Sequence, residues 1–257
     1  MEILDQLGRK IELKQSPQRI ISLVPSQTEL LIDLGLEKNL VGITHYCVHP
    51  EYLREIKTSV GGTKKVNLRK VKALEPDLIL ANKEENTKEM VQELEKIAPV
   101  HVSDVATLED AYDLMECYGQ IFNCEELAVT MVNSIQKKAE NLKKLVATSS
   151  VKKVAYFIWK DPLMVAGKGT FIDEMLKLNK FENVFSESRY PATNLEELKK
   201  KNIDICFLSS EPFPFTEEHK PGFADFAKNV EIVDGEYFSW YGSRLLGTMD
   251  YFKQFHY

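Results

Sequence analysis

Two histidines and a cysteine stand close together in the segment ITHYCVHPEY, where their side chains could bind a metal ion. His45, Cys47 and His49 are interspersed with two tyrosines and a glutamate. Imidazole nitrogen and thiolate sulfur are ligands that Zn²⁺ prefers. His45 and His49 are four residues apart and would share one side of a helix. However, the segment follows a predicted strand and meets Pro50, which makes helical geometry at His45 doubtful.

A larger ligand that carries its own metal is the second interpretation of this segment. A closed zinc site needs about four ligands. The chain offers only three further histidines, His101, His219 and His256. Of these, His219 lies in a polar loop and His256 lies next to the C-terminus. We therefore expect His45 and Tyr46 to line a pocket for a larger ligand, with His45 as an axial ligand to the metal that this ligand carries. The alternative of a divalent zinc, manganese or iron receptor that uses His45 and His49 stays open.

Composition excludes several classes of protein. The chain has 257 residues, of which 44% are hydrophobic, so it can build one large domain or two small ones. A net charge of −6 argues against a nucleic-acid partner. No apolar run is long enough for a transmembrane helix, and the four cysteines form no CxxC pair.

No motif of a known catalytic or cofactor site is present. The sequence lacks GxGxxG, a phosphate-binding loop, GxSxG and HExxH. We therefore expect a binding protein rather than an enzyme, with no intrinsic cofactor and with a bound metal chelate as its ligand.

The elements around these residues alternate between strand and helix. Apolar runs at 19–24, 76–81 and 98–104 are typical of buried strands, and 87–98 has a helical pattern. Ser26 and Glu29 have the spacing of a capping box, and Gly35 stands where that helix would end. This alternation predicts an α/β lobe with a largely parallel sheet.

A long helix is predicted between two such lobes. From Cys124 to about Ala147, apolar residues recur every three or four positions without Gly or Pro, which gives a rod of about 35 Å. The strand and helix alternation then restarts. Residues 67–81 also resemble 194–208, with Asn67 and Asn194 as predicted helix caps. We predict an N-terminal α/β lobe at 1–122, a linking helix at 123–148 and a C-terminal α/β lobe at 149–257.

Four segments resemble the substrate-binding proteins of iron-siderophore, haem and vitamin B12 ABC importers. They are DQLGRKIELKQSPQRIISLVPSQTELLIDLGL, the pair NLRKVKALEPDLIL and NLEELKKKNIDICFL, and THYCVHPEY. The last of these resembles the cobalamin-binding-like branch of this helical-backbone metal receptor superfamily. The resemblance implies a class III periplasmic-binding-protein-like α/β fold. In that fold, two Rossmann-like lobes with central mostly parallel sheets are joined by one long α-helix. It also implies a non-enzymatic protein that holds cobalamin or another corrinoid, haem or a ferric siderophore in the cleft between the lobes.

Loops at the carboxyl ends of the predicted strands supply the candidate ligand-binding residues. In the first lobe they are Pro25, Ser26, Gln27, His45, Tyr46 and Gly62. In the second they are Trp159, Lys160, Arg189, Tyr190, Glu211, Phe238, Trp240, Tyr241 and Arg244. Flat aromatic surfaces suit a large ring ligand. The alternative, that the aromatic residues of 236–244 anchor the C-terminal helix in the core, stays open.

The resemblance implies a partner and a location for the protein, but the sequence differs from the family pattern in two respects, the charge at Arg69 and the start of the chain. The family presents an acidic residue in each paired helix to arginines of the permease. Glu196 fits that role, but Arg69 stands at the matching position of the first lobe, where it would repel an arginine. ABC-type uptake and a role as a leaderless cytoplasmic carrier or sensor therefore both stay open. We expect a monomer, cytoplasmic as written, and periplasmic or membrane-anchored outside the cell if a leader was removed.

Overall fold

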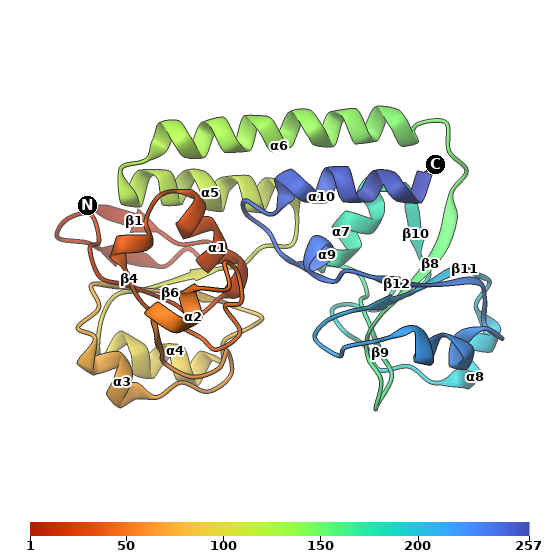
Figure 1. Cartoon of the computed structure of the whole chain (residues 1–257), viewed down its shortest axis with the longest axis horizontal. Helices are drawn as coiled ribbons and strands as arrows, with labels where there is room; N and C mark the ends of the chain where they lie inside the picture. The colour runs from red at the N-terminus through yellow and green to blue at the C-terminus, as the bar shows by residue number, and fades with distance from the viewer. Residues whose placement is uncertain (257) are drawn as a thin grey trace. The chain divides into compact units, whose positions relative to one another are not determined.

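Two compact units make up the part of the chain that the computed structural model describes, residues 1–256 (Figure 1). Unit 1 contains Met1–Val105, Glu109–Asn133 and Tyr241–Arg244. Unit 2 contains Ala106–Leu108, Ser134–Trp240 and the chain from Leu245 onward. The sequence-based division places 241–244 in the second lobe, whereas the contacts of these residues group them with the first.

Unit 1 is built on a five-stranded parallel sheet of order β5-β4-β3-β6-β7. Its strands are β3 (Ile20–Ser22), β4 (Leu40–Ile43), β5 (Thr58–Ser59), β6 (Leu78–Asn82) and β7 (Val100–Ser103). Its helices are α1 (Pro25–Asp33), η1 (Glu37–Asn39), α2 (Leu53–Ile56), α3 (Leu68–Ala73), α4 (Lys88–Glu95) and α5 (Leu108–Phe122). Every residue of β3, β6 and β7 is buried, as expected for a parallel sheet covered on both faces.

An antiparallel hairpin at the N-terminus completes unit 1. Strands β1 (Glu2–Leu4) and β2 (Lys10–Glu12) pair with each other, and the turn between them begins at Asp5. The turn lies against β7, because the Asp5 carboxylate accepts a hydrogen bond from the backbone N–H of Val102.

Unit 2 has a second sheet, of order β10-β8-β11-β12, in which these strands run parallel and β9 pairs antiparallel with β8. Its strands are β8 (Lys152–Trp159), β9 (Met164–Val165), β10 (Phe181–Asn183), β11 (Ile203–Ser209) and β12 (Ala227–Val233). Its helices are α7 (Phe171–Leu178), α8 (Leu195–Lys200), η2 (Glu217–Phe223), α9 (Glu236–Ser239), α10 (Leu245–Phe252) and η3 (Lys253–His256). The two parallel sheets confirm the predicted mixed α/β fold.

Helix α6 (Glu125–Val146) has 22 residues and carries the chain from unit 1 to unit 2. The apolar residues that predicted it are all buried along one face: Ala128, Met131, Val132, Ile135, Ala139, Leu142 and Val146. The spacing of three and four is therefore the pattern of a packed helix face. No helix within residues 1–256 has the length and apolar character needed to cross a bilayer.

The predicted helix ends are confirmed at three positions and wrong at one. Asn67 and Asn194 cap α3 and α8 through their side-chain oxygens, and Gly35 follows α1 with a φ of 78°. The capping box of Ser26 and Glu29 is absent, because α1 begins at Pro25 and its N-cap makes no side-chain hydrogen bond. Glu29 instead pairs with a distant arginine, described below.

Candidate functional site

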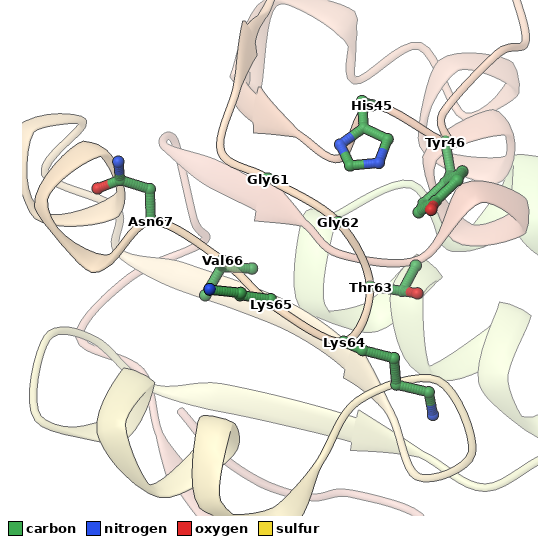
Figure 2. Close-up of a pocket in the computed structure, with 9 residues that line it drawn as sticks. All are labelled: His45, Tyr46, Gly61, Gly62, Thr63, Lys64, Lys65, Val66 and Asn67. Carbon is green, nitrogen blue, oxygen red and sulfur yellow. The ribbon is translucent and has the colours of Figure 1, made fainter.

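A cavity of about 620 Å³ lies in unit 1 beside the segment that opens the sequence analysis. Figure 2 shows its lining, which consists of His45, Tyr46 and the consecutive residues from Gly61 to Asn67. These residues follow β4 and β5, neighbouring parallel strands whose carboxyl ends meet at one edge of the sheet. The site therefore lies where a ligand of a parallel α/β unit is expected.

A tight turn shapes one wall of this cavity. The Gly62 N–H donates to the Lys65 carbonyl at 2.8 Å, and Gly61 pairs with Val66 across the base of the turn. Gly61 has a φ of 131°, and a Cβ there would lie 2.6 Å from the Lys65 carbonyl oxygen. Only glycine fits this position without displacing the backbone.

His45, Tyr46 and Gly62, all predicted as ligand-binding residues, come together at the cavity. The two rings have centroids 4.1 Å apart at an angle of 50°, and Tyr46 is 55% exposed. A Cβ on Gly62 would approach His45 Cε1 at 3.0 Å and Tyr46 Cε2 at 3.3 Å. The missing side chain therefore lets both rings lie close over the turn while they remain open to solvent (Figure 2).

Hydrogen bonds to the loop after β6 hold the turn in place. The Asn86 side-chain amide donates to the Thr63 carbonyl at 2.7 Å, and its carbonyl oxygen accepts from the Asn82 N–H at 2.8 Å. Lys64 Nζ donates to the Glu84 carbonyl. The cavity wall is thus fixed to the loop after β6 before any ligand arrives, as in most small-molecule sites.

Cys47 supports the loop from inside and is not an accessible metal ligand. Its Sγ is fully buried and lies 3.1 Å from Thr28 Oγ1 and 3.3 Å from Thr44 Oγ1. Burial raises the pKa of the Cys47 thiol, because the charged thiolate is poorly solvated there. Within residues 1–256, no group of three or more His, Cys, Asp and Glu side chains is arranged to hold a bare metal ion.

The candidates at the start of α1 lie in the interior of unit 1. Pro25, Ser26 and Gln27 are buried, and the Gln27 amide is fully used by neighbours. Its oxygen accepts from Tyr118 at 2.7 Å, and its nitrogen donates to Ser103 Oγ at 2.6 Å and to Tyr241 at 3.2 Å. Gln27 and Tyr241 are therefore structural partners of each other in this arrangement.

Arg244, another candidate, forms an ion pair inside unit 1. Its Nε and Nη2 donate to the two oxygens of Glu29 at 2.9 and 2.6 Å, and the two side chains are only 12% and 18% exposed. Burial raises the pKa of Glu29, and the Arg244 guanidinium opposes that effect. The pair anchors 241–244 to α1, so Arg244 is not available to a ligand in this arrangement.

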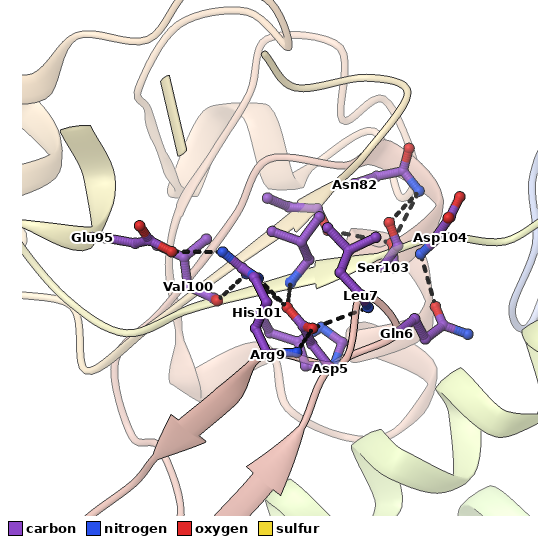
Figure 3. A network of polar contacts seen from close by, with 12 residues as sticks. Asp5, Gln6, Leu7, Arg9, Asn82, Glu95, Val100, His101, Ser103 and Asp104 are labelled. Atoms are coloured by element: carbon purple, nitrogen blue, oxygen red, sulfur yellow. Dashed lines mark hydrogen bonds and ion pairs between the residues drawn. The ribbon is translucent and has the colours of Figure 1, made fainter. Parts of the chain in front are cut away.

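A partly buried polar network lies beside β7. The Asp5 carboxylate accepts from Arg9 Nε at 2.7 Å, and Arg9 also bonds Glu95 and the Val100 carbonyl (Figure 3). His101 is fully buried nearby, and its Nδ1 has no hydrogen-bond partner among the described residues. Burial lowers the pKa of His101 to about 4, with Asp5 opposing and Arg9 adding to the shift. The imidazole is therefore neutral at pH 7.

Phe238, predicted as part of the aromatic wall in unit 2, is a core residue. It is fully buried and packs against the rings of Tyr156, Phe207 and Phe252 at centroid distances of 4.7 to 5.8 Å. Trp240 is also buried, and its indole N–H donates to Glu211 at 2.9 Å. The Glu211 carboxylate accepts from Ser239 as well, at 2.7 Å. Phe238 and Trp240 therefore fit the alternative left open by the sequence, in which these aromatic residues anchor the C-terminal helix in the core, better than a role in a ligand-binding wall.

The other candidates of unit 2 lie at its surface. Trp159, at the end of β8, is 39% exposed and packs edge-to-face against Phe213. Lys160 follows it and is exposed. The Arg189 backbone is fixed by pairing with Gly167 and Lys168, at a φ of 67°, and Tyr190 is half-buried. These four side chains remain candidates.

Sequence reasoning missed most of the cavity wall after Gly62. Lys64 and Lys65 belong to the lining, and Asn67 closes it as the cap of α3. The signal was available in the run GGTKKVN, whose two glycines and short length are typical of a tight turn between paired residues.

The comparisons define the class of protein. Residues 20–233 match the family model described as periplasmic binding protein, so the chain belongs to that family. A vitamin B12-binding protein of Pectobacterium carotovorum is 25% identical over 235 residues, which are 90% of this chain and 85% of that protein. An uncharacterized ABC transporter substrate-binding lipoprotein of Bacillus subtilis, YvrC, is 27% identical over 71% of this chain, and the match spans 60% of its own length.

Solved structures share the fold. The periplasmic vitamin B12 binding protein BtuF of Vibrio cholerae has a TM-score of 0.82 at 21% identity, over 93% of this chain and 96% of that one. The periplasmic heme-binding protein RhuT of Roseiflexus, in its apo form, has a TM-score of 0.81 at 16% identity, over 93% and 98%. At these identities the likeness concerns the fold alone.

Replacing Arg244 with Met should destabilise the protein by about 3 kcal/mol, because the change leaves the largely buried Glu29 carboxylate without its cation. Urea unfolding at pH 7 measures the effect. Lys138→Met is the matched control, since it removes the exposed pair of Lys138 with Asp250 and should cost less than about 1 kcal/mol. Equal losses of unfolding free energy in the two variants would contradict the claim that the buried Arg244–Glu29 pair stabilises the protein more than an exposed pair.

Acid should destabilise the fold through His101. The unfolded chain binds a proton at the ordinary imidazole pKa of 6.5, whereas the folded chain resists protonation until about pH 4. The stability present above pH 6.5 is therefore lost as pH falls from 6.5 to 4, by about 3 kcal/mol at most. Unfolding free energies of His101→Gln should change less over this window than those of the wild type. A His219→Gln control should follow the wild type, and parallel curves for all three proteins would refute the assignment.

Proposed function

We propose that the protein binds a metal chelate reversibly and releases it unchanged, as the solute-binding component of an ABC-type uptake system. Support comes from membership of the periplasmic binding protein family and from relatives that are named for vitamin B12 and heme. A non-enzymatic role also agrees with the sequence, which lacks the catalytic motifs sought above. The chelate is cargo rather than a resident cofactor.

The open pair of His45 and Tyr46 over Gly62 is the observation that carries this proposal. The rings offer flat apolar surface to a macrocycle, and a His45 nitrogen can coordinate the chelated metal. The turn beneath them is fixed by Asn86 and by the Gly62–Lys65 hydrogen bond, so little ordering is needed on binding. A preformed, partly aromatic cavity suits a rigid ligand better than a flexible one.

An importer permease is the proposed partner, with contacts that differ between the units. Glu196 is exposed at the start of α8 in unit 2, where it can meet a basic group. Arg69 is exposed at the matching position of α3 in unit 1, where a complementary permease must present an acidic or neutral group. Named relatives are periplasmic proteins or a lipoprotein. Fractionation of cells that express the full gene distinguishes a periplasmic or membrane-anchored location from a cytoplasmic one.

Optical titration with ferric protoporphyrin and aquocobalamin tests the binding function. We expect at least one to bind, with a spectrum that reports nitrogen coordination and a stabilisation of about 2.7 kcal/mol at a hundred times its Kd. His45→Ala should alter the spectrum, because the axial nitrogen is lost, whereas the His219→Ala control should leave it unchanged. Binding with an identical spectrum in His45→Ala would remove His45 as a metal ligand. Failure of every chelate to bind would contradict the function itself.

A further inference from the structure

The charge around the cavity of unit 1 is one-sided. Its lining contains two cations, Lys64 and Lys65, and no carboxylate. The whole segment from Val60 to Leu74 has no acidic residue, although the chain carries a net charge of −6. It contains five exposed cations: Lys64, Lys65, Arg69, Lys70 and Lys72. The cavity wall is thus a positive region in an otherwise acidic protein.

These cations are not neutralised by ion pairs. Among the described residues, none of the five lies within 4.0 Å of a carboxylate oxygen; Lys64 and Lys70 bond only the backbone carbonyls of Glu84 and Ser59. Glu84 and Glu85 belong to the loop after β6, whose Glu84 carbonyl accepts from Lys64, and neither lines the cavity. An exposed cation that forms no ion pair can accept a negatively charged ligand at little desolvation cost.

The cations Lys64 and Lys65 and the two rings line the same cavity. Figure 2 shows His45 and Tyr46 above the turn and the side chains of Lys64 and Lys65 leaving it on other sides. The turn is rigid while the lysine side chains are long and flexible. The Lys65 ammonium can turn toward the rim of a ligand whose centre lies at His45, and the Lys64 ammonium can do so once it leaves the Glu84 carbonyl. A chelate with acidic groups on its periphery would engage both features at once.

We propose that the cavity selects chelates with peripheral carboxylates, such as ferric protoporphyrin, over neutral amide-bearing corrinoids such as cyanocobalamin. This inference rests on the proposed function and narrows its ligand class. A charge-assisted hydrogen bond from Lys64 or Lys65 to a carboxylate favours the acidic chelate by roughly tenfold to a hundredfold. The selectivity should weaken as salt screens the exposed lysines.

Affinities for three probes test the proposal: ferric protoporphyrin, its dimethyl ester and cyanocobalamin, each at 50 and 300 mM salt. The wild type should bind the diacid at least tenfold more tightly than the diester at low salt. A Lys64→Ala, Lys65→Ala double variant should lose that difference, so that it binds the diacid and the diester with equal affinity. Arg69→Ala with Lys72→Ala is the matched control, because it removes the same charge from the same segment outside the cavity lining.

The outcomes separate the inference from the function beneath it. Equal affinities of the wild type for diacid and diester would overturn the inference and leave the binding function intact. So would tighter binding of cyanocobalamin, or equal losses in the two double variants, which would indicate a diffuse field rather than the cavity lysines. If none of the probes binds, both the inference and the proposed function fail. Thermal unfolding of each variant verifies that it is folded.

Discussion

The buried amide of Gln27 fixes the arrangement on which the rest of unit 1 depends. It joins four parts of the chain, because α1 provides the amide while α5, β7 and the segment 241–244 provide its partners Tyr118, Ser103 and Tyr241. A buried amide that loses a partner costs roughly 1–3 kcal/mol, so each of these parts is held in register with α1. The strands β4 and β5, whose carboxyl ends carry the cavity, belong to the same sheet as β7.

Local patterns in the sequence were sufficient for the elements and the fold class. The face of α6 and the caps Asn67 and Asn194 involve residues only a few positions apart, and these interactions form as their spacing predicts. Glu29 shows where this reasoning stops. Its expected partner was the backbone of the same helix, but its actual partner, Arg244, lies 215 positions away. A long-range ion pair leaves no trace in local spacing.

The candidate site was predictable only in part, for a related reason. Position after a strand identified His45, Tyr46 and Gly62, but it selected Gln27 and Phe238 equally well. Whether a side chain at a strand end points outward or into the core depends on packing against distant elements, such as the rings of Tyr156 and Phe252 around Phe238. Lys64 and Lys65 were overlooked because exposed lysines are common and neither directly follows a predicted strand, as Lys160 does.

The return of 241–244 to unit 1 makes the two units interleaved in sequence. The chain leaves unit 2 after Trp240, contributes Tyr241 and Arg244 to unit 1, and resumes unit 2 at Leu245. Neither unit is therefore a continuous stretch that a gene fragment could encode. A fragment ending near residue 133 would leave the Glu29 carboxylate and the Gln27 amide short of partners. Evolution by exchange of one unit for another would require cuts at five junctions rather than one, because the chain changes unit after residues 105, 108, 133, 240 and 244.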